Sequence, residues 1–272
     1  MANVAFIAPG LAASTHQCVH AMLANARQHI ATPDHADLAV ANWFDGPPPC
    51  NATVRWWVGS DVLALDRGRT RPHSTDERLN WAVSHPLVRE LHALGVAARE
   101  LPIVPHWEPE PLPRAADPLV LLYCPQGRES LYRWPDLVAV ARRCPHVRFK
   151  VFRRPGPSPL PNLTCVPGFV GREAMLDAYR HARAVLRLVE HDGTSLSILE
   201  ALGFGRHAIW SYPYPACTHA TTVDEAVAAV HQAVEADLNT AGVAAMETLR
   251  RAAHARLAHY VEDALRCTSP SH

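Results

Sequence analysis

Short apolar runs alternate with amphipathic stretches along most of the chain, and the apolar runs are nearly continuous. Such runs are typical of strands buried on both faces of a parallel sheet, and the amphipathic stretches are typical of the helices that join them. In the first part of the chain this pattern predicts strands at residues 4–8, 36–41, 54–58 and 100–105, and helices at about residues 16–29 and 86–94.

The alternation is clearer in the second part of the chain. It predicts strands at residues 118–124, 147–153, 163–168, 184–189 and 207–212, and helices at residues 134–144, 172–182, 196–205, 223–236 and 241–261. Strand and helix units that alternate at this spacing predict the α/β class, here with two Rossmann-like domains of doubly wound parallel sheet.

A proline-rich segment separates the two parts. Residues 105–118 contain five prolines in fourteen positions, a density that prevents both a helix and an internal strand. We therefore expect a compact N-terminal domain at residues 1–111 and a C-terminal domain at residues 112–272. Two such domains predict a cleft between them, with ligands bound where the parallel strands end.

Composition narrows the function classes. The 272 residues carry 26 Lys and Arg against 26 Asp and Glu, and this zero net charge disfavours a protein that grips nucleic acid over a wide area. The seven cysteines are scattered without a Cys-x-x-Cys pair, which is typical of reduced thiols in a cytoplasmic protein. No apolar run is long enough for a membrane span, and the N-terminus is expected to form a strand instead of a signal peptide.

The most informative stretch is "DGTSLSILEALGFGRHAIWSYP", which begins at Asp192. The Asp-Gly-Thr-Ser turn precedes a predicted helix, and the unpaired amides of a helix N-terminus form a ready site for an anion such as a diphosphate. Asp192 would address hydroxyl groups beyond that anion, since a carboxylate repels phosphate. Glu200, inside the helix, has the chemistry to accept hydrogen bonds from the cis-diol of a ribose. These features together describe a nucleotide sugar.

This stretch resembles the donor-binding signature of retaining GT-B glycosyltransferases with a Glu-x7-Glu motif, which are family 4-like. Asp192 takes the position of the first acid and Glu200 that of the second. The resemblance implies that the first acid contacts the transferred sugar, that the second binds the ribose, and that the diphosphate lies on the amides of Gly193, Thr194, Ser195 and Leu196. The chain departs from the family pattern in having Asp as the first acid and Thr-Ser in place of an aromatic-glycine pair.

Upstream segments extend the resemblance to residues 118–262. In "NLTCVPGFVGREAMLDAYRHARAVLRL", the resemblance implies that Phe169 and Val170 line the base pocket. In "YCPQGRESLY", Arg128 occupies the position of a diphosphate ligand, and Arg133 is the candidate replacement for the family's following lysine. The N-terminal part matches more weakly, through "WWVGSDVL" alone.

The N-terminal domain offers candidates for the acceptor side. Gly10 and His16 follow the first predicted strand, while Ser60 and Asp61 follow the strand at residues 54–58. Loops after strands line the ligand edge of a parallel sheet, so His16 and Asp61 are candidate catalytic residues and Gly10 a candidate donor-binding residue. The alternative interpretations are an ordinary surface histidine and an aspartate that caps a helix.

His16 and His20 are four residues apart, as in a zinc-binding helix, but Gln17 stands where the zincin glutamate is needed. We therefore expect no metal site.

These patterns predict an enzyme that moves a sugar from a nucleotide-diphosphate sugar to an acceptor, with retention and without a metal or resident cofactor. The acceptor class stays open between a glycan, a lipid-linked sugar, a small molecule and, with no support from charge, modified DNA. Two alternatives also remain: a non-catalytic donor-binding subunit that needs a partner, and a sugar-nucleotide epimerase on the same fold.

Overall fold

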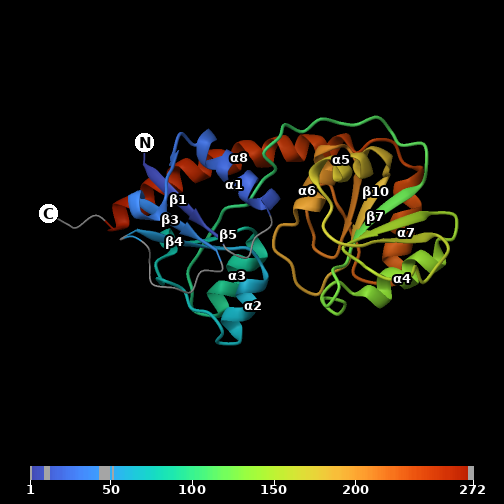
Figure 1. Ribbon diagram of the computed structural model, residues 1–272, viewed down its shortest axis with the longest axis horizontal. Coiled ribbons are helices and arrows are strands. Elements are labelled where there is room, and N and C mark those ends of the chain that lie inside the picture. Colours follow the sequence, from blue (N-terminus) through green and yellow to red (C-terminus); the bar gives the residue numbers. More distant parts are fainter. Residues whose placement is uncertain (1, 9–12, 43–49, 51, 269–272) are drawn as a thin grey trace. The chain divides into compact units, whose positions relative to one another are not determined.

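The computed structural model describes residues 2–8, 13–42, 50 and 52–268 (Figure 1). The chain forms two compact units, one made of Met1–Trp107 with Leu249–His272 and one made of Glu108–Thr248. Within the described residues, each unit contains a six-stranded parallel sheet with helices on both of its faces. The predicted α/β class with doubly wound parallel sheets is therefore confirmed.

The sheet of the first unit has the strand order β2-β1-β3-β4-β5-β6. Helix α1 covers one face, and α2 with α3 covers the other (Figure 1). The bounds are β1 (Asn3–Ile7), α1 (Ala13–Asn25), β2 (His29–Ile30), β3 (Leu38–Ala41), β4 (Thr53–Trp57), α2 (Ser60–Asp66), β5 (Asn80–Ala82), α3 (His85–Ala93) and β6 (Arg99–Glu100), with 3-10 turns at Pro33–His35 and Glu77–Leu79.

The sheet of the second unit has the strand order β12-β11-β10-β7-β8-β9. Helices α4 and α7 lie on one face, and α5 and α6 on the other (Figure 1). The bounds are β7 (Leu119–Tyr123), α4 (Trp134–Arg143), β8 (Arg148–Phe152), β9 (Leu163–Val166), α5 (Arg172–His181), β10 (Ala184–Arg187), α6 (Leu196–Gly203), β11 (His207–Trp210), β12 (Thr218–His219) and α7 (Val223–Glu235).

The strand order of the second sheet reverses between β7 and β10. These two strands are direct neighbours, with Leu121 opposite Val185, although many residues separate them in the chain. Apolar side chains on both sides of this centre are fully buried, which explains the continuous apolar runs in the sequence. Ligands of open α/β sheets bind at such a reversal, beyond the carboxyl ends of the strands.

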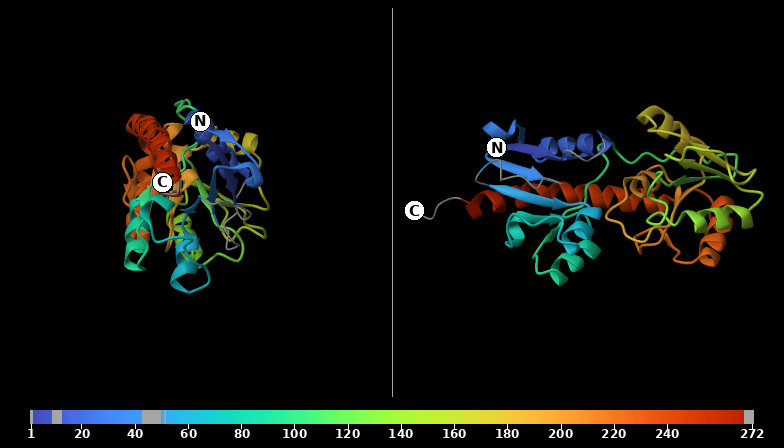
Figure 2. Two further views of the ribbon diagram at one scale, coloured as in Figure 1. Left: turned by 90° about the vertical axis from the view of Figure 1, so that its left-hand side faces the viewer. Right: turned by 60° about the horizontal axis from the view of Figure 1, so that its bottom comes forward.

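The last helix, α8 (Thr240–Thr268), is one continuous helix (Figure 2, red) whose later turns belong to the first unit. The sequence pattern predicts one boundary near residue 112 and places the whole C-terminus in the second domain. The structure divides the chain between Trp107 and Glu108 and again after Thr248. An amphipathic pattern shows that a helix packs on something, but it does not show on which sheet.

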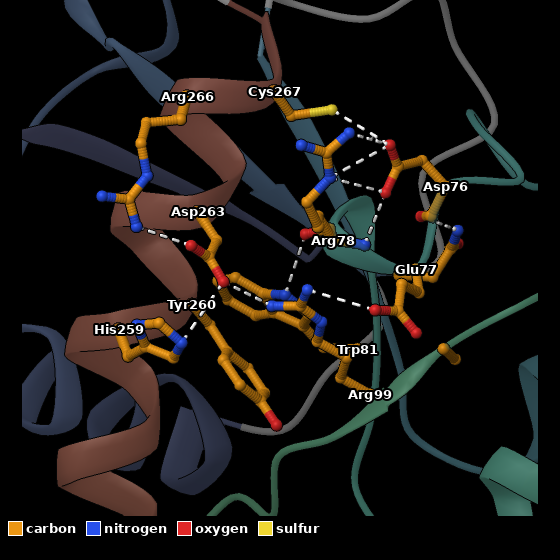
Figure 3. A network of polar contacts seen from close by, with 12 residues as sticks. Asp76, Glu77, Arg78, Trp81, Arg99, His259, Tyr260, Asp263, Arg266 and Cys267 are labelled. Atoms are coloured by element: carbon orange, nitrogen blue, oxygen red, sulfur yellow. Dashed lines mark hydrogen bonds and ion pairs between the residues drawn. The ribbon is translucent and has the colours of Figure 1, made fainter.

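Polar contacts fasten the later part of α8 to the first unit (Figure 3). Asp263 pairs with Arg99 of β6 at 2.7 Å, and Cys267 donates to Asp76 at 3.2 Å. Tyr260 packs its ring against Trp81, with ring centroids 6.1 Å apart. These contacts bring the end of the helix back to the first sheet.

We expect the substitution Leu257→Ala to destabilise the first unit by about 2–4 kcal/mol, because Leu257 is fully buried and truncation leaves a cavity. Hydrogen exchange would show lost protection in β4 and β5 and unchanged protection in β7 and β10. Glu262→Ala on the same helix is the exposed control. Loss of protection confined to the second unit would contradict the assignment of this part of α8.

Candidate active site in the second unit

The loop after β7 presents an arginine at the reversal of strand order. Gly127 takes a positive φ of 78°, which permits the tight turn before Arg128. A backbone hydrogen bond connects this loop to the end of β8: the Gln126 amide donates to the carbonyl of Arg153, the residue after that strand, at 3.1 Å. Arg128 is exposed, and within the described part of the chain its guanidinium makes no hydrogen bond or ion pair. It is therefore available to an anion.

The loop after β10 leads into α6 on the other side of the reversal. Ser195 is the N-cap of α6, and its hydroxyl lies 2.9 Å from that of Ser197. The first amides of a helix have no partner inside the helix, so this N-terminus favours an anion. The Gly193 amide, by contrast, donates to Oδ1 of Asp192 at 3.1 Å. The Ile198 and Leu199 amides donate to the Ser195 carbonyl, so the amides of Leu196 and Ser197 are more readily offered to an anion than that of Gly193.

Asp192 forms a two-pronged ion pair with Arg187, the last residue of β10. Arg187 Nε donates to Oδ2 at 2.5 Å, and Nη2 donates to Oδ1 at 2.9 Å. Trp210 Nε1 also donates to Oδ2, at 3.2 Å. Both side chains of the pair are largely buried, with 10% of Arg187 and 11% of Asp192 exposed.

Glu200 lies on α6 with only 16% of its side chain exposed. Arg172 at the start of α5 donates to Oε1, and the Tyr179 hydroxyl donates to Oε2 at 2.8 Å. Burial raises the pKa of the Glu200 carboxyl above its ordinary value, and the attraction of Arg172 offsets this rise only in part. A carboxylate has about four acceptor positions, and within the described part of the chain two of those on Glu200 receive no hydrogen bond.

Phe169 and Val170 follow β9 and the positive-φ residue Gly168. Phe169 is 65% exposed, which is unusual for a large aromatic side chain. An exposed ring at the ligand edge of a sheet can stack on a nucleobase.

Arg133 is engaged elsewhere. It is the N-cap of α4 in a left-handed conformation, with a φ of 47°. Its guanidinium pairs with Asp136 at 2.7 Å and with Glu190 at 3.4 Å, and it donates to the Thr221 carbonyl at 2.8 Å. These contacts fasten the start of α4, and they leave Arg128 as the arginine that is open to a phosphate.

In the first unit, His16 lies near the end of β1. Its Nε2 is 3.0 Å from the Ala8 carbonyl oxygen, and its ring packs edge-on against that of Phe6, with centroids 5.2 Å apart. The other candidate after this strand, Gly10, lies outside the described residues.

Asp61 is in the first turn of α2 and is fully buried. Its carboxylate accepts hydrogen bonds from the amides of Val58, Gly59 and Val62 and from Asn42 Nδ2, at 2.9–3.1 Å. Burial raises the pKa of this carboxyl, while the hydrogen bonds from the Val58 and Gly59 amides oppose the rise. The N-cap of α2 is Gly59, so Asp61 is not the cap itself; its carboxylate holds the turn that precedes the helix. The neighbouring Ser60 is exposed.

Sequence reasoning missed the partners of both acids in the second unit. Arg187 was the residue with a detectable signal, because a charged side chain inside an otherwise apolar strand needs a buried partner. Arg172 and Tyr179 gave no such signal, since arginine and tyrosine are ordinary on an amphipathic helix.

Within the described residues, no group of three or more His, Cys, Asp or Glu side chains could hold a metal ion. In the same part of the chain, no helix is both long and apolar enough to cross a membrane.

The fold is that of the GT-B glycosyltransferases. The lipopolysaccharide outer core galactosyltransferase WaaB in its apo form has a TM-score of 0.57 at 11% identity, over 97% of this chain and 99% of that chain. A UDP-forming trehalose-phosphate synthase from Burkholderia xenovorans has a TM-score of 0.57 at 8% identity, over 94% and 78%.

A mutant of S. aureus TarM, in complex with Fondaparinux, alpha-GlcNAc-glycerol and UDP, also has a TM-score of 0.57, at 10% identity, over 85% of this chain and 55% of that chain. The chain thus spans about half the length of the TarM chains it resembles. A scan against protein-family models and a search of the curated proteins find no match. At identities this low, the structural likeness shows the fold.

We expect Asp61→Ala to lower the free energy of unfolding by about 2–4 kcal/mol, because it leaves several buried donors without an acceptor. Urea unfolding would measure the change, with Asp66→Ala on the exposed side of α2 as the control. Unchanged stability of Asp61→Ala would contradict this structural role and return Asp61 to the acceptor-side candidates.

Proposed function

We propose that this chain is a glycosyltransferase that uses a nucleotide-diphosphate sugar and transfers the sugar with retention. The observation that carries the proposal is the Glu200 carboxylate. The Glu200 side chain is only 16% exposed, and within the described part of the chain each of its oxygens accepts one hydrogen bond, from Arg172 and from Tyr179. A carboxylate oxygen accepts about two hydrogen bonds, so one acceptor position on each oxygen would serve a ligand. Two neighbouring hydroxyls of a ribose match these two positions.

The diphosphate would lie between Arg128 and the start of α6. Arg128 supplies a guanidinium whose planar fork matches phosphate geometry, and the first-turn amides add the favourable end of the helix dipole. Stabilising the leaving diphosphate is the main electrostatic task in such a transfer. These groups perform it with the chain's own residues, so we propose that catalysis needs no metal ion.

The base would stack on Phe169, beside Val170, on the Glu200 side of the diphosphate. The sugar would lie at the other end, toward the Asp192 turn. The first unit would bind the acceptor. The candidate residues there are His16, which is partly exposed, and Ser60, which is exposed. Retention rests on the sequence resemblance, and the acceptor class stays open.

The structural neighbours support a uridine donor as the first choice for testing. One TarM structure contains UDP, and the trehalose-phosphate synthase is described as UDP-forming. WaaB, which the chain matches over nearly its full length, is described as a galactosyltransferase.

The proposal predicts that one of the UDP-, GDP-, TDP- or ADP-sugars raises the melting temperature. At a concentration of one hundred times Kd, binding adds about 2.7 kcal/mol to the free energy of unfolding. With an acceptor panel and EDTA present, nucleoside diphosphate should be released and the product should keep the anomeric configuration, as read by NMR. Release of an epimerised donor would identify an epimerase, and binding without turnover would identify a donor-binding subunit. No binding of any nucleotide sugar would overturn the proposal.

We expect Glu200→Gln to weaken binding of the nucleoside diphosphate by about tenfold or more, because an amide accepts from only one of its two terminal atoms. The 2′,3′-dideoxy form of the same nucleotide should bind the unaltered protein and Glu200→Gln about equally. Calorimetry would measure both, with Glu173→Gln on exposed α5 as the control. If Glu200→Gln lost the same affinity for the ribonucleotide and for its dideoxy form, Glu200 would not bind the ribose hydroxyls.

A further inference from the structure

Arg187 places a buried positive charge at the reversal of strand order in the second unit. It ends β10, and its guanidinium lies 5.1 Å from the ring of Tyr132 and 6.0 Å from that of Tyr123. Burial alone lowers the pKa of a guanidinium, but the attraction and hydrogen bonds of Asp192 outweigh this effect and raise the pKa of Arg187. Arg187 therefore stays charged and depends on Asp192 as its counter-ion.

The carboxylate of Asp192 is filled with donors. Oδ2 accepts from Arg187 Nε and Trp210 Nε1, and Oδ1 accepts from Arg187 Nη2 and the Gly193 amide. Since a carboxylate has about four acceptor positions, none remains for a sugar hydroxyl. A hydroxyl that displaced Arg187 would leave a buried charge without its partner, which is strongly unfavourable. The Glu200 carboxylate, in contrast, accepts hydrogen bonds at only two of its four positions within the described residues.

The ion pair joins the segments that shape the donor side of the sheet. The Arg187 carbonyl accepts from the Ser211 amide at 3.1 Å, and the Asp192 amide donates to the Tyr212 hydroxyl at 3.2 Å. Oδ1 of Asp192 also holds the Gly193 amide, two residues before the N-cap of α6. The end of β10, the start of the β11 loop and the turn into α6 thus meet at one buried charge pair.

We propose that Arg187 and Asp192 are a positioning pair, which holds the turn into α6 so that the first amides of the helix meet the diphosphate, and that the Asp192 carboxylate does not contact the sugar. The proposal rests on the proposed donor site. It replaces the sugar-contacting role that the family resemblance gives to the first acid. Arg187, which lies outside the motif, becomes a determinant of diphosphate binding.

The test compares Arg187→Gln, Arg187→Lys, Asp192→Asn and the double variant Arg187→Gln/Asp192→Asn. Calorimetry would measure binding of the nucleoside diphosphate that the unaltered protein binds, and of the matching nucleoside. We expect Arg187→Gln and Asp192→Asn each to bind the nucleoside diphosphate about tenfold more weakly, a difference of about 1.4 kcal/mol. Binding of the nucleoside should stay unchanged. The double variant should lose no more than either single variant, because both remove the same ion pair.

Arg187→Lys keeps the charge without the two-pronged contact, so an intermediate loss is expected. The double variant removes both buried charges together, which keeps the test valid if a single variant fails to fold. Arg148→Gln/Asp117→Asn removes an exposed pair on the same sheet and serves as the control. In kinetics, the donor KM should rise more than kcat falls.

Unchanged diphosphate binding by Asp192→Asn, with kcat alone lost, would overturn the positioning role and restore the sugar contact. Additive losses in the double variant would overturn the pair as a unit. If the unaltered protein binds no nucleoside diphosphate, the proposed function itself fails, and the positioning role falls with it.

Discussion

All strands of a parallel sheet end at the same edge, and the rest of the site depends on where the strand order reverses along that edge. In the second unit the reversal brings β7 and β10 side by side, with Leu122 opposite Leu186. The next residues of the two strands are Tyr123 and Arg187, so an aromatic ring and a buried charge meet at the point where two loops diverge. Any ligand bound there is held by both loops, although more than sixty residues separate them in the chain.

A buried charge at that point constrains its surroundings. Arg187 requires a counter-ion that is close and well aligned, because an unpaired charge in a nearly dry site is far more costly than a missing hydrogen bond. Asp192 meets this requirement with two of its acceptor positions, and Trp210 Nε1 and the Gly193 amide take the other two. Asp192 and Glu200 therefore differ in how many acceptor positions the fold itself uses. The Asp192 carboxylate accepts four hydrogen bonds from the protein itself, whereas the Glu200 carboxylate accepts two within the described residues.

The sequence predicted the second unit well because its strands are apolar on both faces and its helices are strongly amphipathic, so that period and burial agree. It predicted the first unit less well. The strand β5 is only Asn80–Ala82, and the helix α2 only Ser60–Asp66, lengths at which periodicity carries little information. The positions of Asp192 and Glu200 on a loop and a helix were also predictable. The pairing of Glu200 with Arg172 was not, since the two residues lie 28 positions apart and only the folded chain brings them together. Arg187 gave a signal, as a charge in an otherwise apolar strand, but that signal does not identify its partner.

The division of labour between the acids also bears on how a compact site can select a nucleotide sugar. Discrimination is strongest where a site contains polar groups that only the correct ligand satisfies. In the proposed donor site Glu200 would be such a group, because its remaining acceptor positions would be desolvated without a partner if no diol filled them. Asp192 is not, since its hydrogen bonds are complete before any ligand arrives. Under the proposed function, selectivity in this unit would rest on the ribose and the diphosphate, and selection among sugars would come from other side chains.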